Sequence, residues 1–239
     1  MNSLNIKKER DGGFTLLELL IVISIIAILS VALVLVLNPA EALKKSRDAQ
    51  RISDLSTLKT ALGLYLTSTT TPHLGGASDD TTCKATPTGA YASGDVVYYS
   101  LVGAGTITDT TTDGGSTSVP DPINVAVPAL TDGTGWIPVN FDSLTGGSPI
   151  SNLPVDPSNA FNVKTTNGGD DAVGDITSDS AFYRYVCSAS PLAFEIDAIL
   201  ESDAFTTGAD DKRTTDGGNN SNFYEVGTNL RILGTGFDF

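Results

Sequence analysis

The feature that most constrains this chain is an apolar run of 24 residues that covers residues 14–37. Only Thr15, Glu18, Ser24 and Ser30 interrupt it. At about 1.5 Å per residue the run makes about 36 Å of helix, which is enough to cross a bilayer core of about 30 Å. The apolar part of an ordinary secretory signal is shorter, at about 7–15 residues. We therefore expect a membrane-spanning helix here.

The polar segment before this run sets its orientation. It carries three basic residues within the first ten positions, and Lys and Arg stay on the cytoplasmic side of a membrane. Everything after Leu37 is therefore expected outside the cytoplasm. Two features do not suit a plain anchor. Gly12-Gly13 offers a flexible backbone to a protease just before the run, and Glu18 places an ionisable group inside it, which marks a function.

These residues carry a resemblance to a known family. Gly13 followed by Phe14-Thr15-Leu16-Leu17-Glu18-Leu19-Leu20, behind a short basic leader, resembles the prepilin signature of type IV pilins and type II secretion pseudopilins. Weaker similarity to the long helix and sheet of that family continues through residues 47–55, 61–65, 153–157 and 182–185. The resemblance implies that a prepilin peptidase cuts between Gly13 and Phe14 and methylates the new α-amine of Phe14.

The resemblance also implies that Glu18 faces the α-amine of Phe14 in a neighbouring subunit. The physical chemistry agrees, because an α-amine with a pKa of about 7.7–8.0 is largely cationic at neutral pH. Burying the Glu18 carboxylate alone is costly, and pairing it with that amine offsets the lost hydration. Glu18 would then fix the register in which subunits join a homopolymer.

Two other interpretations of the N-terminal segment stay open. Ala40-Glu41-Ala42 fits the small-residue pattern of a signal-peptidase site, so the first 42 residues would be a secretory signal. The other interpretation is a plain single-pass anchor. The length of the apolar run and the presence of Glu18 count against the secretory signal, and Gly12-Gly13 and Glu18 count against the anchor.

Beyond the run, the sequence predicts an amphipathic helical segment at residues 38–66. Asn38-Pro39 is expected to bend or break the helix, because proline removes a donor and clashes with the preceding turn. We expect an apolar stripe to pack on a sheet, and residues 14–66 to make about 80 Å of helix, subject to this kink. The stripe recurs at helical spacing, with basic residues mostly off it, at Ile52, Leu55, Leu58, Leu62 and Tyr65.

The rest of the chain is predicted to form one antiparallel sheet domain with long surface loops. Period-two patterns and turn residues predict strands at residues 96–101, 181–187, 192–198, 222–226 and 230–233. The alternation over 192–198 is the clearest, and it predicts a half-buried strand that pairs with 181–187. Gly, Asp, Asn and Thr clusters predict loops at residues 75–82, 103–118, 131–135, 166–180 and 207–222.

The expected fold class is therefore α+β and pilin-like. A long N-terminal helix, with a transmembrane half and an amphipathic half, packs on a C-terminal antiparallel sheet domain. The expected organisation is a leader peptide, a transmembrane and filament-core helix, an amphipathic half-helix and an extracytoplasmic domain, at residues 1–13, 14–37, 38–66 and 67–239.

The charge of the chain excludes several functions. The net charge is −14, and from residue 61 onward 6 Lys and Arg residues face 22 Asp and Glu residues. Nucleic-acid affinity rests on Lys and Arg neutralising phosphates, so we expect no nucleic-acid binding by the globular body. A single His and two Cys argue against His-based catalysis and against a Cys/His zinc site. The chain is not expected to be an enzyme.

The two cysteines lie in the part expected outside the cytoplasm, where disulfides are permitted. A bridge between Cys83 and Cys187 would close a loop of about 105 residues, which the chain-entropy model values at about 4–5 kcal/mol. The compartment favours the bridge, and two free thiols are the alternative.

One acidic loop offers oxygen ligands of the kind that Ca²⁺ takes. The spacing is not that of an EF-hand, so a structural Ca²⁺ stands beside the simpler alternative of a solvated loop. No other cofactor is expected. The candidate ligands are Asp210, Asp211, Asp216, Asn219 and Asn222.

These observations favour a structural subunit of a type IV pilus-like surface filament. Its expected partners are copies of itself, the prepilin peptidase, and the pilus or secretion assembly machinery. The precursor is expected in the bacterial cytoplasmic membrane, and the assembled subunit at the cell surface. The alternatives are a pseudopilin of a type II secretion system and a monomeric anchored or secreted binding domain.

Overall fold

The computed structural model describes residues 13–76, 80–89, 91–92, 94–102, 107–108, 121–125, 127–158, 162–164, 173–175 and 181–235. The chain divides into two compact units, Met1–Ala42 and Leu43–Phe239. The predicted leader lies outside the described residues except for Gly13. The predicted loops at 103–118 and 166–180 also lie outside them, apart from two short strands.

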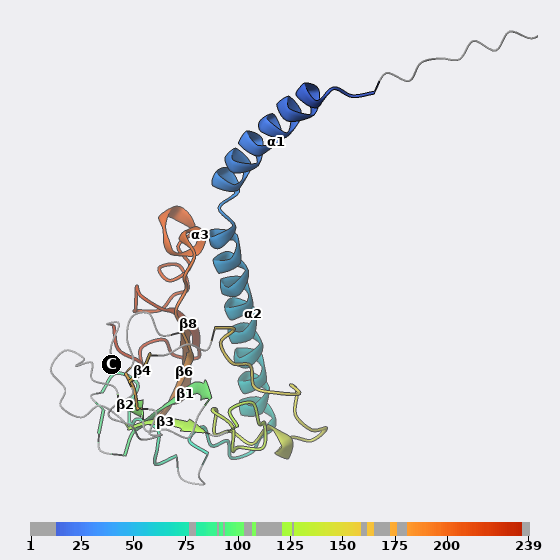
Figure 1. Cartoon of the computed structure of the whole chain (residues 1–239). Coiled ribbons are helices and arrows are strands. Elements are labelled where there is room, and N and C mark those ends of the chain that lie inside the picture. The colour runs from blue at the N-terminus through green and yellow to red at the C-terminus, as the bar shows by residue number, and fades with distance from the viewer. Residues whose placement is uncertain are drawn as a thin grey trace, which may run out of the picture. The chain divides into compact units, whose positions relative to one another are not determined.

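The N-terminal unit contains one long helix, α1, which spans Leu16–Leu37 (Figure 1). Its large apolar side chains are exposed, as in Ile25 at 52%. The hydroxyls of Ser24 and Ser30 donate to backbone carbonyls one turn earlier, each at 2.7 Å, which satisfies them within the helix. Residues Leu16–Leu33 have a mean hydropathy of 2.9, and among the described residues only this helix is long and apolar enough to cross a membrane.

The predicted break falls at Asn38, between two helices. Asn38 adopts the left-handed conformation with φ of 37°, which asparagine tolerates better than most residues and which commonly ends a helix. Helix α2 then spans Pro39–Ser68, and Pro39 suits its first turn because no amide donor is needed there. The expected bend or break at Asn38-Pro39 is therefore a break between two helices.

The amphipathic prediction for α2 is confirmed. Leu55, Leu58 and Leu62 are fully buried, Tyr65 is 6% exposed, and Ile52 is half-buried. They pack against the face of the sheet that carries Tyr98, Tyr185, Phe194 and Ile196, together with Trp136 and Phe141. The hydrophobic core of the second unit therefore lies between α2 and the sheet (Figure 1).

The main sheet has five strands in the order β3-β1-β6-β7-β8. Four of them form an antiparallel sheet: β1 (Val96–Val102), β6 (Tyr183–Ala189), β7 (Leu192–Ala198) and β8 (Tyr224–Gly227). Strand β3 (Asp121–Val125) adds to β1 in parallel, which the expectation of a wholly antiparallel domain did not include. A small second sheet has the order β2-β5-β4, from Ile107–Thr108, Val173–Asp175 and Asn162–Lys164.

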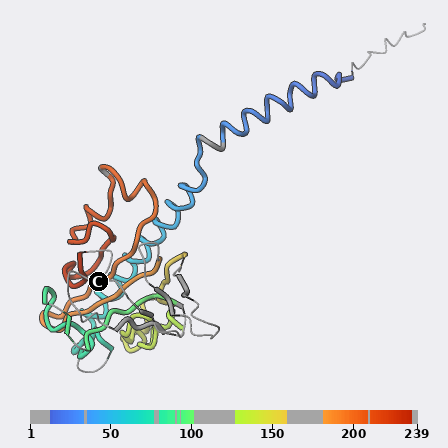
Figure 2. Tube along the Cα trace, turned by 60° about the vertical axis from the view of Figure 1, so that its left-hand side comes forward, coloured from blue at the N-terminus to red at the C-terminus, as the bar shows by residue number. Residues whose placement is uncertain are grey.

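In the connections that the structure describes there are three short helical elements. They are η1 (Phe141–Ser143), α3 (Asp203–Thr206) and η2 (Gly208–Asp210). The predicted hairpin is present as β6 and β7, and Figure 2 shows both in orange beside the red C-terminal segment.

The strand predicted at residues 192–198 is present as β7, but the prediction that it is half-buried was wrong. The second face of the sheet is also covered, because Ile232 and Leu233 pack over Val97, Tyr99, Phe182 and Val186. Glu195 and Asp197 are consequently buried rather than solvated. Alternation of polar and apolar residues identifies two faces, but it does not reveal that a distant segment covers the polar one.

The predicted strand at residues 230–233 is also absent. This segment is turn and bend, and the amides of Ile232 and Leu233 donate to Oε2 of Glu195 at 2.6 and 2.8 Å. The buried carboxylate of Glu195 therefore satisfies these two amides, which in a strand would bond to a neighbouring strand. The neighbouring prediction at 222–226 corresponds to β8, shifted by two residues at its start.

Cys83 and Cys187 form a disulfide with a Cα–Cα distance of 4.7 Å. The amide of Lys84 donates to the carbonyl of Cys187 at 2.9 Å, beside the bridge. The bridge thus attaches the segment between α2 and β1 to strand β6.

Candidate functional site

The predicted cleavage site lies in non-helical backbone before α1. Phe14 is 83% exposed, and a Cβ added to Gly13 would meet no atom within 4 Å. The fold of this chain therefore imposes no requirement for glycine at position 13. If glycine is needed there, the need comes from an enzyme that reads the site.

Glu18 takes part in the cap of α1. Its Oε2 accepts from the backbone amide of Thr15 at 2.9 Å and from the Thr15 hydroxyl at 2.8 Å. The Thr15 Oγ1 in turn accepts from the amide of Glu18 at 3.2 Å. This reciprocal pair is a capping box, which satisfies amides that the first turn of a helix leaves free.

Sequence reasoning assigned Glu18 only to an intersubunit contact and missed the role of Thr15. The signal was available, since Thr followed three residues later by Glu at the start of an apolar helix is the capping-box pattern. Glu18 therefore has a local role and still lies beside the residue that would become the new N-terminus. Its carboxylate is bound to the amide of Thr15, one residue after Phe14.

The second site is a buried ionic cluster between α2 and two loops of the domain. Arg51 has a fully buried side chain, and it donates to Asp156 through Nε at 2.6 Å and Nη2 at 3.0 Å. It also donates to Asp48 at 2.7 Å, and it forms an ion pair with Glu201. We call Asp48, Arg51, Asp156 and Glu201 the helix anchor.

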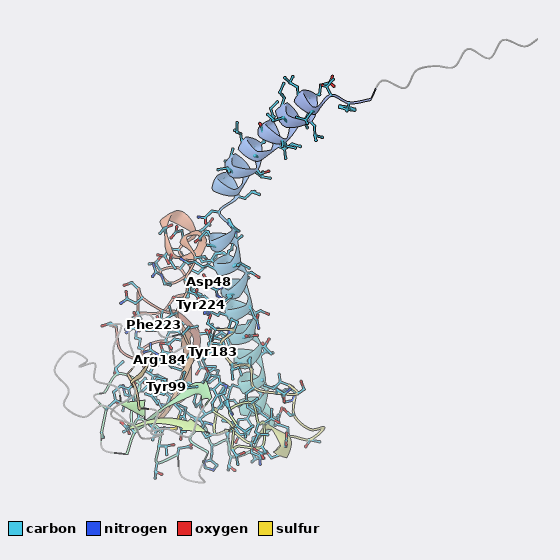
Figure 3. All side chains as sticks on the ribbon, viewed as in Figure 1. Asp48, Tyr99, Tyr183, Arg184, Phe223 and Tyr224 are labelled. Atoms are coloured by element: carbon cyan, nitrogen blue, oxygen red, sulfur yellow. A yellow bond between two sulfur atoms is a disulfide. The ribbon has the colours of Figure 1, made fainter. Side chains whose placement is uncertain are left out.

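Asp48 extends this anchor to the backbone of the loop after β7. Its carboxylate accepts from the amides of Glu201 and Ser202, at 3.0 and 2.7 Å. Figure 3 labels Asp48 in the first half of α2. The first half of the helix is thus fixed by polar contacts, and the second half by the apolar core.

The charges of the anchor are mutually stabilised. Burial disfavours the ionised form of Glu201, but hydrogen bonds from Arg47 and Arg51 outweigh it and lower the pKa of Glu201 to about 2. Burial also disfavours the charge on Arg51, and the bonds to Asp156 and Asp48 more than compensate, so the pKa of Arg51 is raised. Glu201 and Arg51 are therefore both charged at neutral pH. Sequence reasoning missed it because Arg51 lies off the apolar stripe.

A second buried polar cluster lies on the far face of the sheet. Arg184 pairs with Asp197 across β6 and β7, and its guanidinium carbon lies 3.7 Å from the centroid of the Phe223 ring. Figure 3 places Arg184, Phe223 and Tyr99 together on the body of the domain. Asp197 was expected to contact solvent, but it pairs with the buried guanidinium of Arg184 instead.

Glu195 and Glu225 form an unusual pair beside it. Both are buried. Oε2 of Glu195 accepts from the amides of Ile232 and Leu233, and Oε2 of Glu225 accepts from the amide of Asn220 at 2.9 Å. Burial and a hydrogen bond to Glu195 raise the pKa of Glu225 to about 10. Glu225 therefore keeps its proton at neutral pH, so the pair does not bury two adjacent negative charges.

The five candidate calcium ligands lie in the segment from η2 to the start of β8. Asp211 pairs with Arg213 at 2.9 Å, and Asp216 accepts from the amides of Gly218 and Glu225, each at 2.8 Å. The Asn222 amide donates to a neighbouring side chain at 2.9 Å, and Asp210 and Asn219 are exposed. Among the described residues no group of three or more His, Cys, Asp or Glu is placed to hold a metal ion. The calcium site stays a prediction.

Comparison with known proteins adds one finding at the N-terminus. Residues 9–34 match the family model described as the prokaryotic N-terminal methylation motif, which is the prepilin leader motif of type IV pilin and pseudopilin families. A search of the curated proteins and of the solved structures finds no match. An apolar helix followed by a helix and a four-stranded antiparallel sheet is an α+β, pilin-like arrangement.

The motif supports a type IV pilin-like or pseudopilin-like protein, and it points to a structural protein rather than an enzyme. It also implies processing by prepilin peptidase and assembly into pilus-like filaments. A leader motif with an apolar helix fits a membrane-anchored precursor.

Proposed function

We propose that this chain is the structural subunit of a type IV pilus-like surface filament. The observation that carries the proposal is the combination of the leader motif with α1, a helix whose large apolar side chains are exposed and which carries one acidic residue, Glu18. Exposed apolar area of this size must be covered by lipid or by copies of the same helix. The membrane covers it in the precursor, and neighbouring subunits cover it in the filament.

Glu18 would select the packing of these helices. An apolar helix surface can slide along another with little change in contact energy, whereas a carboxylate in an apolar environment requires a partner at one position. The α-amine that cleavage creates at Phe14 is such a partner, and it lies at the same end of the helix. Uncleaved chains have no amine there and would not assemble.

The experiment separates the charge of Glu18 from its role in the cap. Glu18→Gln keeps an acceptor for the amide of Thr15, since glutamine also serves in capping boxes, but it removes the charge. We expect this variant to insert in the membrane and to be cleaved before Phe14, as intact mass would show, while electron microscopy finds few or no filaments. Ser24→Ala is the control, because it changes a self-satisfied hydroxyl on the same helix.

Normal filament yield from Glu18→Gln would contradict the pairing mechanism. Failure of cleavage before Phe14 in the parent chain would contradict the filament proposal itself. A pseudopilin of a secretion system shares the processing and the helix packing, and the presence or absence of filaments on the cell surface at natural expression levels distinguishes the two.

A further inference from the structure

The small-residue segment Ala40-Glu41-Ala42 is not used by the proposed assembly mechanism. It begins three residues after Leu37, where the apolar helix α1 ends. A membrane-bound signal-type endopeptidase cleaves downstream of an apolar segment. It accepts small residues at the first and third positions before the cut. The bond that this pattern designates is Ala42–Leu43.

The local structure makes this bond reachable. Ala40, Ala42 and Leu43 are exposed, and they lie in the first turn of α2, directly after the helix break at Asn38 and Pro39. The amides of Glu41 and Ala42 both donate to the carbonyl of Asn38, at 3.1 and 3.2 Å. A terminal turn opens at low cost, because it loses few hydrogen bonds, and none of residues 39–43 is fully buried.

The segment after this bond is a structural unit by itself. The division between the two compact units falls between Ala42 and Leu43. The first fully buried residue of α2 is Asp48, and the whole helix anchor lies on the C-terminal side of the bond. Removal of residues 14–42 therefore leaves the helix anchor and the apolar core in the remaining chain.

We propose that Ala42–Leu43 is a second processing site, at which a membrane-bound endopeptidase releases residues 43–239 as a soluble domain. Water supplies a hydroxyl group to the carbonyl carbon of Ala42 and a proton to the amine of Leu43 as the peptide bond breaks. The proposal rests on the membrane orientation in the proposed function, which places Leu43 outside the cytoplasm. The leader cut produces the subunit that assembles, and the second cut produces a form that lacks α1 and does not assemble.

The two cuts differ in what they require of the backbone. Gly13 and Phe14 already lie in non-helical backbone, whereas Ala42 and Leu43 are helical and must first unwind. Assembly buries α1 among other copies and removes the chain from the membrane surface. We therefore expect the released domain to be the minor product, and to increase when assembly is blocked.

The test is intact-mass analysis of the full-length chain expressed in a bacterium that processes prepilins, with the envelope and soluble extracytoplasmic fractions measured separately. We expect a species that begins at Phe14 in the envelope and one that begins at Leu43 in the soluble fraction. Ala42→Leu and Ala40→Leu should each remove the soluble species, because a large side chain does not fit a subsite for small residues. Ala42→Ser should retain it.

Ala49→Leu is the matched control, since it makes the same change at an exposed position of α2 outside the motif. Absence of the Leu43 species from the parent chain, or its persistence in Ala42→Leu, would overturn the second processing site. Absence of the Phe14 species would instead overturn the proposed function. The two species are measured in different fractions, so either proposal can fail alone.

Discussion

Arg51 provides the sharpest test of the packing between α2 and the domain. Replacing it with Met keeps most of the volume of the side-chain stem but removes the guanidinium that joins three carboxylates. Asp48 and Asp156 would then be fully buried without a cation. Breaking a buried ion pair by removing one partner costs about 3–5 kcal/mol. The cost should stay in that range, because backbone amides still donate to Asp48 and to Asp156.

For a domain of this size, a loss of about 3–5 kcal/mol lowers the melting temperature by about 6–20 °C. The measurement is thermal and urea unfolding of the fragment Leu43–Phe239, followed by circular dichroism. Lys59→Met is the control, because Lys59 is an exposed cation on the same helix and its loss should change stability by less than about 0.5 kcal/mol.

A second variant tests the cause rather than the size of the effect. Adding Asp156→Asn to Arg51→Met removes one of the two stranded charges, so part of the lost stability should return. If Arg51→Met unfolds within about 1 kcal/mol of the parent domain, a difference typical of an ordinary point mutation, the anchor does not hold the helix. If the double variant is less stable than the single one, uncompensated charge is the wrong explanation.

Two further predictions concern the domain. The raised pKa of Glu225 means that the folded state keeps a proton that the unfolded state loses above its ordinary pKa of 4.5, so stability should fall as the pH rises from there towards about 10. Glu225→Gln should flatten this pH dependence in urea titrations at several pH values, and the exposed Asp142→Asn should leave it unchanged. Equal pH dependence for the parent and Glu225→Gln would contradict the raised pKa of Glu225. The disulfide closes a loop with a sequence separation of 104 residues, so replacing both cysteines with Ala should cost about 4–5 kcal/mol. An unchanged melting curve in that double variant, measured by calorimetry, would show that the bridge does not limit the unfolded chain.

Local patterns predicted the elements of this fold well. The apolar run and the helical spacing of Leu55, Leu58, Leu62 and Tyr65 each depend on neighbours in sequence, and the structure contains both helices. The hairpin of β6 and β7 was also predictable, because its strands are adjacent. The capping box of Thr15 and Glu18 was equally local and was missed only because Glu18 already had another role.

Long-range polar contacts were not predictable in the same way. Arg51 resembles the other basic residues of α2 until Asp156 is brought to it from a sequence separation of 105 residues. Asp48 meets the amide of Glu201 over a separation of 153 residues. Glu195 looked like the solvent side of an alternating strand because nothing near it in sequence shows that residues 232 and 233 cover that face. In each case the residue is buried by a partner that lies far from it in the sequence, so local patterns do not reveal the burial.

The helix anchor also determines how this domain would carry mechanical load. In a filament under tension, force enters the domain through the first turns of α2, where the helix would otherwise peel from the sheet one turn at a time. Asp48 and Arg51 instead bind residues from two separate loops, around Asp156 and Glu201, within a single turn of helix. Because these ion pairs lie within one turn of α2, they would have to break together before this part of the helix could separate from the domain.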